Sequence, residues 1–114
     1  METWILIAIL IAFLVWRMKP TKGVKTISTA ELKGMLNDKD KVFVDVRTQG
    51  EFRGRNIAQF KNMPLGTDFS KLPKDKEIVV ICQSGMRSKQ ACSQMKKLGY
   101  EKVTNVRGGM SAYR

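Results

Sequence analysis

The stretch IVVICQSGMRS, at residues 78–88, joins an apolar run to a helix-like segment through a short loop that begins with a cysteine. The β-branched residues before Cys82 are typical of a buried strand, and the helical pattern continues to about Leu98. Backbone N–H groups of a tight loop before a helix converge on one point, where the helix dipole adds positive charge. Such a cradle favours a thiolate and any anion attached to it. The stretch therefore predicts a nucleophile, Cys82, at the carboxyl end of a strand.

The loop around Cys82 supplies the other candidate site residues. We expect Cys82 and Arg87 to be the catalytic pair, because a planar guanidinium suits sulfonate- or phosphate-like groups. Gly85 allows close backbone approach, Ser88 either caps the helix or contacts the anion, and Met86 either lines the mouth of the site or fills it. The residues expected to bind substrate are Gln83, Ser84, Gly85, Met86 and Ser88.

The composition limits the chemistry available to Cys82. The 114 residues contain no histidine and two cysteines, Cys82 and Cys92. Without histidine there is no Cys–His pair and no usual zinc site, so backbone dipoles and positive side chains must activate the thiol, and no metal or cofactor is expected. Two cysteines make a poor disulfide scaffold and indicate a reducing compartment. We interpret Cys92 as a small core residue, with a resolving thiol as the alternative.

The net charge of the chain is +11, and +9 of it belongs to residues 24–114. A basic balance attracts anions, such as small anionic substrates or lipid head groups. The positive residues are scattered among acidic ones, and no Lys/Arg block contains interleaved aromatic residues. The pattern is therefore typical of a well-solvated basic surface, and no nucleic-acid partner is expected.

The N-terminal segment WILIAILIAFLVW, residues 4–16, is apolar on all sides and bounded by tryptophans. Positive residues only follow it, which predicts a single-pass membrane anchor over 1–19 with the N-terminus outside, a linker over 20–23 and a cytoplasmic catalytic domain. These 13 residues span about 20 Å as a helix, short of the ~30 Å hydrocarbon core. The alternatives are a buried helix and a cleaved signal peptide, although a signal peptide carries positive charge before its apolar core.

Residues 24–114 alternate strand-like and helix-like segments. Such alternation predicts an α/β domain with a parallel sheet and helices on both faces. Ligands of these sheets bind beyond the carboxyl ends of the strands, where Cys82 lies. The strand candidates are 25–27, 42–46, 60–63, 78–81 and 103–106.

Five groups of residues in this domain resemble the rhodanese (sulfurtransferase) family, in the order that the family has them. They are VDVR with EF (44–52), NMPL (62–65), ICQSGMRS (81–88), LGY (98–100) and RGGM with AY (107–113). The resemblance covers about 24–114 and implies a single rhodanese domain with a central parallel sheet, preceded here by the predicted transmembrane helix. It further implies that Cys82 carries a persulfide sulfur from a small anionic donor, such as thiosulfate, to a thiol or protein acceptor.

Asp45 and Arg47 end the strand next to that of Cys82. We interpret them as supporting residues, a structural ion pair or loop anchor rather than direct catalysts. Two positions depart from the family pattern: Asn56 stands at a frequent histidine and Tyr113 at a frequent tryptophan. Neither change touches the loop.

Two other functions remain open at this stage. The first is a cysteine-dependent phosphatase or arsenate reductase on the same fold. Such phosphatases have one residue more in the loop than the Cys-x4-Arg spacing of Cys82 and Arg87, which favours a sulfur atom as cargo. The second is a non-catalytic, membrane-tethered binding module, against which the intact cysteine and arginine count.

Overall fold

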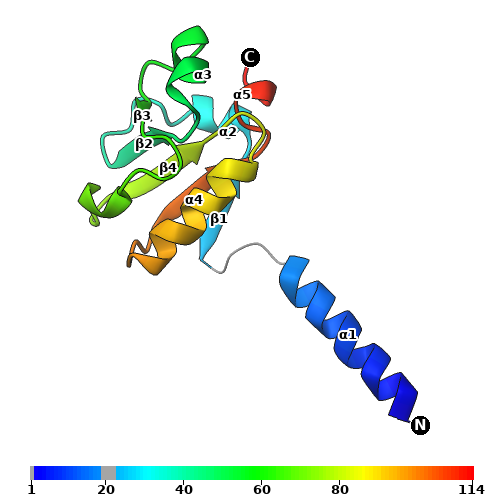
Figure 1. The fold of residues 1–114 in the computed structure, drawn as a ribbon. Coiled ribbons are helices and arrows are strands. Elements are labelled where there is room, and N and C mark those ends of the chain that lie inside the picture. Colours follow the sequence, from blue (N-terminus) through cyan, green and yellow to red (C-terminus); the bar gives the residue numbers. More distant parts are fainter. Residues whose placement is uncertain (1, 19–22) are drawn as a thin grey trace.

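The computed structural model describes residues 2–18 and 23–114, and its centre is a five-stranded sheet (Figure 1). All strand pairs are parallel, in the order β1-β5-β4-β2-β3. The α/β fold with a parallel sheet and helices on both faces is thus confirmed. The strands are β1 (Val24–Ile27), β2 (Lys41–Asp45), β3 (Lys61–Asn62), β4 (Glu77–Ile81) and β5 (Val103–Val106).

Short helices connect the strands. Two of them begin with capping boxes, Ser28 with Glu31 and Thr48 with Glu51. The 3-10 turn η1 has no counterpart among the predicted elements. The helical elements after α1 are α2 (Thr29–Lys33), α3 (Gln49–Gly54), η1 (Phe69–Lys71), α4 (Met86–Lys97) and α5 (Gly109–Ala112).

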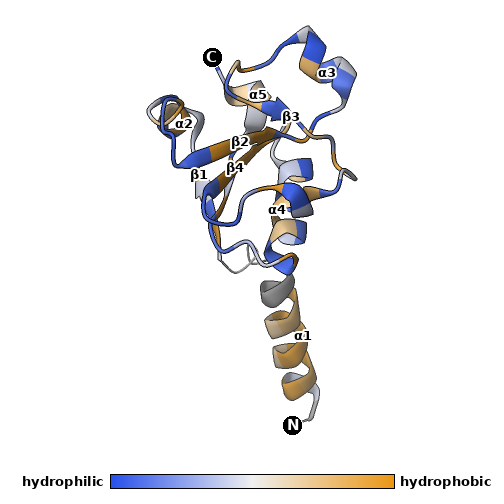
Figure 2. Ribbon diagram, turned by 90° about the vertical axis from the view of Figure 1, so that its left-hand side faces the viewer, coloured by the Kyte–Doolittle hydropathy of each residue, from blue (hydrophilic) through white to orange (hydrophobic). Residues whose placement is uncertain are grey.

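The sheet has a hydrophobic core on each face. Helix α4 and η1 cover one face, where Cys92 and Phe69 are buried against the strands. Helices α2 and α5 contribute Leu32 and Met110 to the other face. Strand β4 lies between β2 and β5, and its last four residues are completely buried. Figure 2 colours this strand as hydrophobic. Continuous burial on both faces explains its unbroken apolar sequence.

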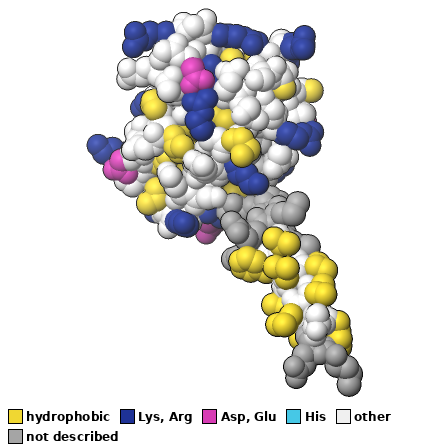
Figure 3. All heavy atoms as spheres, turned by 45° about the vertical axis from the view of Figure 1, so that its right-hand side comes forward, with side chains coloured by type: hydrophobic (Ala, Val, Ile, Leu, Met, Phe, Trp, Pro, Cys, Tyr) yellow, Lys and Arg dark blue, Asp and Glu magenta, His cyan; other side chains and the backbone are white. Residues whose placement is uncertain are grey.

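Helix α1 (Glu2–Met18) stands outside both cores, and its apolar side chains are exposed, Trp4 by 62% and Leu6 by 66% (Figure 3). Within the described residues, no helix has both the length and the apolar character to cross a membrane. The predicted transmembrane helix over 1–19 is therefore not supported. The physical reason is length: the 17 residues of α1 give about 26 Å, against ~30 Å of hydrocarbon. Residues 20–22 of the predicted linker lie outside the described residues.

Candidate active site

Cys82 directly follows β4, and its side chain is completely buried beneath the loop that leads into α4. The N–H of Gly85 donates a hydrogen bond to Sγ of Cys82 at 2.9 Å. Gly85 has φ of 101°, a left-handed conformation that side chains rarely adopt, and it is the N-cap residue of α4. The glycine therefore lets the loop turn back so that a backbone N–H reaches the sulfur.

The environment of Cys82 favours its thiolate. Burial acts to raise the pKa of the thiol, but hydrogen bonds from the Ser88 hydroxyl and from the N–H groups of Ser88, Gly85 and Ser84 outweigh it. The net result is a pKa below the ordinary value of a cysteine. Because the thiolate is the nucleophile, reactivity is present above this lowered pKa and is lost as the pH falls through it.

Replacing Ser88 with alanine should raise the pKa of Cys82, because the thiolate loses one hydrogen-bond donor. The rate of alkylation by iodoacetamide, measured between pH 5 and 10, gives the midpoint. We expect the unsubstituted protein to have its midpoint below that of an ordinary cysteine and Ser88→Ala to shift the midpoint upward. Burial raises the pKa of Cys92 to about 12, so this thiol should not contribute. Equal midpoints in the unsubstituted protein and in Ser88→Ala would show that Ser88 does not stabilise the Cys82 thiolate.

Asn105 holds the Ser88 side chain in place. Oγ of Ser88 lies 2.5 Å from Oδ1 of Asn105 and 3.1 Å from the carbonyl oxygen of Gly85. Ser88 lies inside the first turn of α4 rather than at its N-cap, so it does not have the capping role considered above. Asn105 lies in β5 and was missed by sequence reasoning, because only the sheet brings it beside the loop.

Arg87 forms a bidentate ion pair with Glu51 of α3. The distances are 2.6 Å from Nη1 to Oε1 and 2.9 Å from Nη2 to Oε2, and about a third of each side chain is exposed. Hydrogen bonding to Arg87 lowers the pKa of Glu51 to about 2, so this carboxylate is ionised at neutral pH. Glu51 also forms the capping box of α3 with Thr48.

Asp45 and Arg47 form a buried ion pair beneath the loop. Nη2 of Arg47 lies 2.8 Å from Oδ2 of Asp45, and the Arg47 side chain is only 3% exposed. The same guanidinium donates to Oε1 of Gln83 at 3.3 Å and to the carbonyl oxygen of Arg55 at 2.6 Å. Through these bonds Arg47 anchors the loop to the end of β2 and to α3.

The N-terminal turn of α5 supports the loop from below. The N–H of Met110 donates to the carbonyl oxygen of Cys82 at 2.8 Å, and the N–H of Ser111 donates to that of Gln83 at 2.9 Å. Gly109 has φ of 54°, and a Cβ there would lie 2.2 Å from the Cys82 carbonyl oxygen. Only glycine fits this contact, which fixes the position of the cysteine backbone.

Comparison with known proteins places this arrangement in a family. The family model of the rhodanese-like domain matches residues 28–114. The chain belongs to the rhodanese-like domain family. A sulfurtransferase from Allochromatium vinosum is 36% identical over 94 residues, which cover 79% of this chain and 88% of that protein. The crystal structure of a rhodanese-like domain protein from Staphylococcus aureus matches with a TM-score of 0.72 and 32% identity, covering 79% of this chain and 91% of that one.

The rhodanese domain is also similar to part of a larger enzyme. A tRNA uridine(34) hydroxylase from Enterobacter sp. is 32% identical over 96 residues, which cover 76% of this chain and 28% of the hydroxylase. The similarity thus concerns a fraction of that protein. Together with the sulfurtransferase relative, the family supports a sulfurtransferase-type enzyme.

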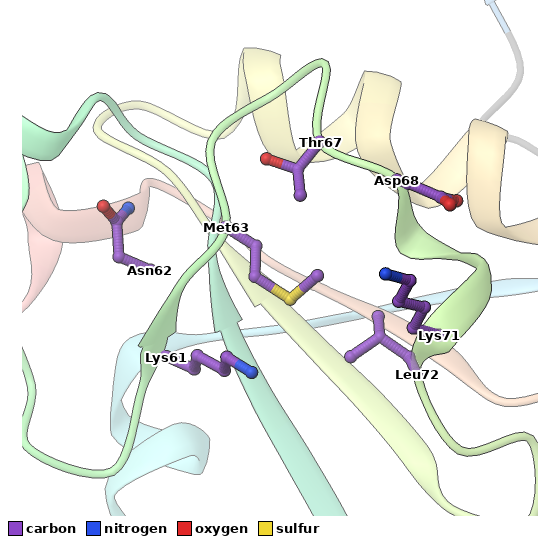
Figure 4. Close-up of a pocket in the computed structure, with 7 residues that line it drawn as sticks. All are labelled: Lys61, Asn62, Met63, Thr67, Asp68, Lys71 and Leu72. Atoms are coloured by element: carbon purple, nitrogen blue, oxygen red, sulfur yellow. The ribbon is translucent and has the colours of Figure 1, made fainter.

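A separate pocket of about 350 Å³ lies at the β3 edge of the rhodanese domain (Figure 4). Lys61 and Lys71 flank it, and Met63 and Leu72 supply its apolar wall. None of the candidate site residues lines this pocket. It is therefore distinct from the loop around Cys82.

Proposed function

We propose that the protein is a sulfurtransferase that carries a persulfide sulfur on Cys82. In the first half-reaction the Cys82 thiolate attacks the outer sulfur of a donor such as thiosulfate. A bond forms between Sγ and that sulfur, the S–S bond of thiosulfate breaks, and sulfite leaves with the electron pair. The loop N–H groups that lie around the sulfur stabilise the negative charge on the persulfide.

In the second half-reaction a thiophilic acceptor attacks the terminal sulfur of the persulfide. Cyanide serves in the assay, and a small thiol or a protein thiolate is the corresponding cellular acceptor. The S–S bond to Cys82 breaks, the acceptor keeps the sulfur, and Cys82 leaves as the thiolate. The cycle is balanced without an external oxidant or reductant.

One observation carries the proposal: a cysteine with a lowered pKa, hydrogen-bonded to the N–H of Gly85 at 2.9 Å, begins a loop at the carboxyl end of the central strand. The Cys-x4-Arg spacing of this loop supports sulfur transfer over a phosphatase or arsenate reductase. The chemical competence of the thiol supports an enzyme over a binding module.

The proposal predicts that the protein forms thiocyanate from thiosulfate and cyanide much faster than it hydrolyses an aryl phosphate. The physical reason is that the short loop encloses one sulfur atom rather than a phosphoryl group. Thiocyanate and phosphate release are measured on the same preparation, with a Cys82→Ser protein as the background. Robust phosphate release that depends on Cys82 would overturn the assignment.

We also propose that α1 holds the domain at the cell membrane, with the catalytic domain on the cytoplasmic side. The support is chemical: the exposed side chains of α1 are apolar on all sides, including Ile7, Leu10 and Phe13, and positive residues follow the helix in the sequence. Such a surface is unfavourable in water and favourable in hydrocarbon.

Full-length protein in isolated membranes should resist both high salt and alkaline carbonate and should require detergent. The reason is that apolar burial, unlike attraction between basic residues and anionic lipid, is insensitive to salt. A protein lacking residues 1–23 should be soluble and active, because the loop and its supports lie after Val24. Recovery of the full-length protein in the salt wash would contradict hydrophobic attachment. Loss of folding on truncation would instead indicate that α1 is buried against the domain.

A further inference from the structure

The guanidinium of Arg87, the positive group of the Cys82 loop, is already paired with a carboxylate in this structure. Glu51 takes both terminal nitrogens of Arg87, at 2.6 Å and 2.9 Å, in the paired geometry that guanidinium groups otherwise offer to sulfonates and phosphates. A sulfonate group can use the same two nitrogens only by displacing the carboxylate. An anionic donor must therefore compete with the Glu51 carboxylate for Arg87, the side chain that was expected to bind it.

Each of the two ion pairs that flank the loop, Arg87 with Glu51 and Arg47 with Asp45, is neutral as a pair. Glu51 stays ionised at every pH at which a rhodanese-type reaction would run, since Arg87 lowers its pKa to about 2. A dianion such as thiosulfate gains little from a neutral pair and is repelled by the nearby carboxylate, whereas a donor of low charge is much less affected.

The edge of the loop carries an apolar group beside this ion pair. Met86, the residue before Arg87, is 70% exposed. An exposed thioether can contact an organic or protein group and offers nothing to a small inorganic anion. The exposed Met86 and the paired Arg87 thus both favour an organic donor of low charge over an inorganic dianion.

We propose that Glu51 is a specificity-determining residue that, by occupying Arg87, selects persulfides of an organic or protein thiol over thiosulfate as the sulfur donor. The inference rests on the proposed function and names its donor class. The Cys82 thiolate attacks the outer sulfur of R–S–SH, the S–S bond of the donor breaks, and RS⁻ leaves with the electron pair. The proton of the outer sulfur passes to the leaving thiolate, so that the products are the Cys82 persulfide anion and R–SH.

The test compares two donors in Glu51→Gln, which frees Arg87 and keeps the capping box, because glutamine also serves at this position. We expect the KM for thiosulfate to fall by about tenfold with little change in kcat, as when one close charge interaction is altered. The KM for 2-aminoethyl persulfide, which has almost no net charge, should change by less than about twofold. Glu31→Gln is the matched control: it removes a carboxylate from the equivalent box of α2 and should change neither constant.

Anion binding is also measured without turnover, from the protection that sulfite gives Cys82 against iodoacetamide. Sulfite should protect Glu51→Gln at about tenfold lower concentration, and this gain should be absent in Arg87→Ala/Glu51→Gln. Three results would each overturn the proposal: unchanged sulfite protection in Glu51→Gln, equal gains for both donors, or a gain that persists without Arg87. If neither donor loads Cys82, the proposed function fails, while sulfite protection still decides the role of Glu51.

Discussion

A Cys82→Ser protein should form no measurable thiocyanate from thiosulfate and cyanide. A serine hydroxyl does not ionise under the hydrogen bonds that lower the pKa of the Cys82 thiol. Its oxygen also cannot form the persulfide that carries the transferred sulfur. Loss of a nucleophile typically costs four to six orders of magnitude in turnover, on the order of the whole chemical acceleration. Thiocyanate formation is measured beside the melting temperature, because an unchanged fold is needed to attribute the loss to chemistry.

Cys92→Ser is the matched control for this substitution. It makes the same atomic change in the same core, at a thiol that is completely buried in α4 and whose pKa burial raises to about 12. Such a thiol stays protonated, so turnover should persist. If Cys92→Ser were inactive and Cys82→Ser active, the nucleophile would be assigned to the wrong cysteine.

Gly109→Ala should nearly abolish sulfur transfer although the residue touches no substrate. Its Cβ would lie 2.2 Å from the Cys82 carbonyl oxygen and 2.8 Å from the Gln83 carbonyl carbon, so the loop or α5 must move. A displacement of about 1 Å at a reacting group costs roughly a hundredfold in rate. The left-handed backbone adds about 1–2 kcal/mol of strain to the destabilisation. Steady-state turnover and the urea midpoint measure the two effects.

Gly66→Ala separates the backbone strain from the collision. Gly66 also has positive φ, 99°, but a Cβ there would meet no described heavy atom within 4 Å. We expect Gly66→Ala to lose some stability and to keep its turnover. Equal losses of turnover in the two variants would show that the contact between α5 and the loop does not position Cys82.

Local sequence signals were sufficient for most of the fold. The unbroken apolar run of β4 and the capping boxes at Ser28 and Thr48 depend on neighbouring residues, and each element formed where its signal lies. The ends of elements were predicted less well: the strand expected over 60–63 is only the two residues Lys61–Asn62. The order of the strands was not predicted, since the pattern alone does not determine which strands pair.

The candidate site was visible in sequence only as far as the loop itself. Residues that reach the loop from other elements carry no local mark: Asn105 reads as an ordinary strand residue, and Glu51 as half of a capping box. The need for glycine at 109 comes from contact with Cys82, 27 positions away in the chain. The pairing of Arg87 with Glu51 is the clearest case, because the sequence predicted an arginine reserved for substrate.

For the N-terminal helix, the sequence predicts the local structure but not its relation to the membrane. Its sequence predicts an apolar helix, and α1 forms over Glu2–Met18, but helical periodicity does not say whether such a helix is long enough to cross a bilayer. The charge pattern predicts an orientation and leaves the depth of insertion open. Detergent and carbonate extraction therefore address a question that the pattern alone leaves undecided.

Intact mass after incubation with thiosulfate tests the role of Cys82 as a sulfur carrier most directly. We expect the unsubstituted protein to gain the mass of one sulfur atom and to lose it on addition of cyanide or dithiothreitol. Cys82→Ser should gain nothing, and Cys92→Ser should behave as the unsubstituted protein does. A sulfur adduct that forms equally well in Cys82→Ser, or an unsubstituted protein that takes up no sulfur from thiosulfate or from a persulfide, would contradict sulfur transfer through Cys82.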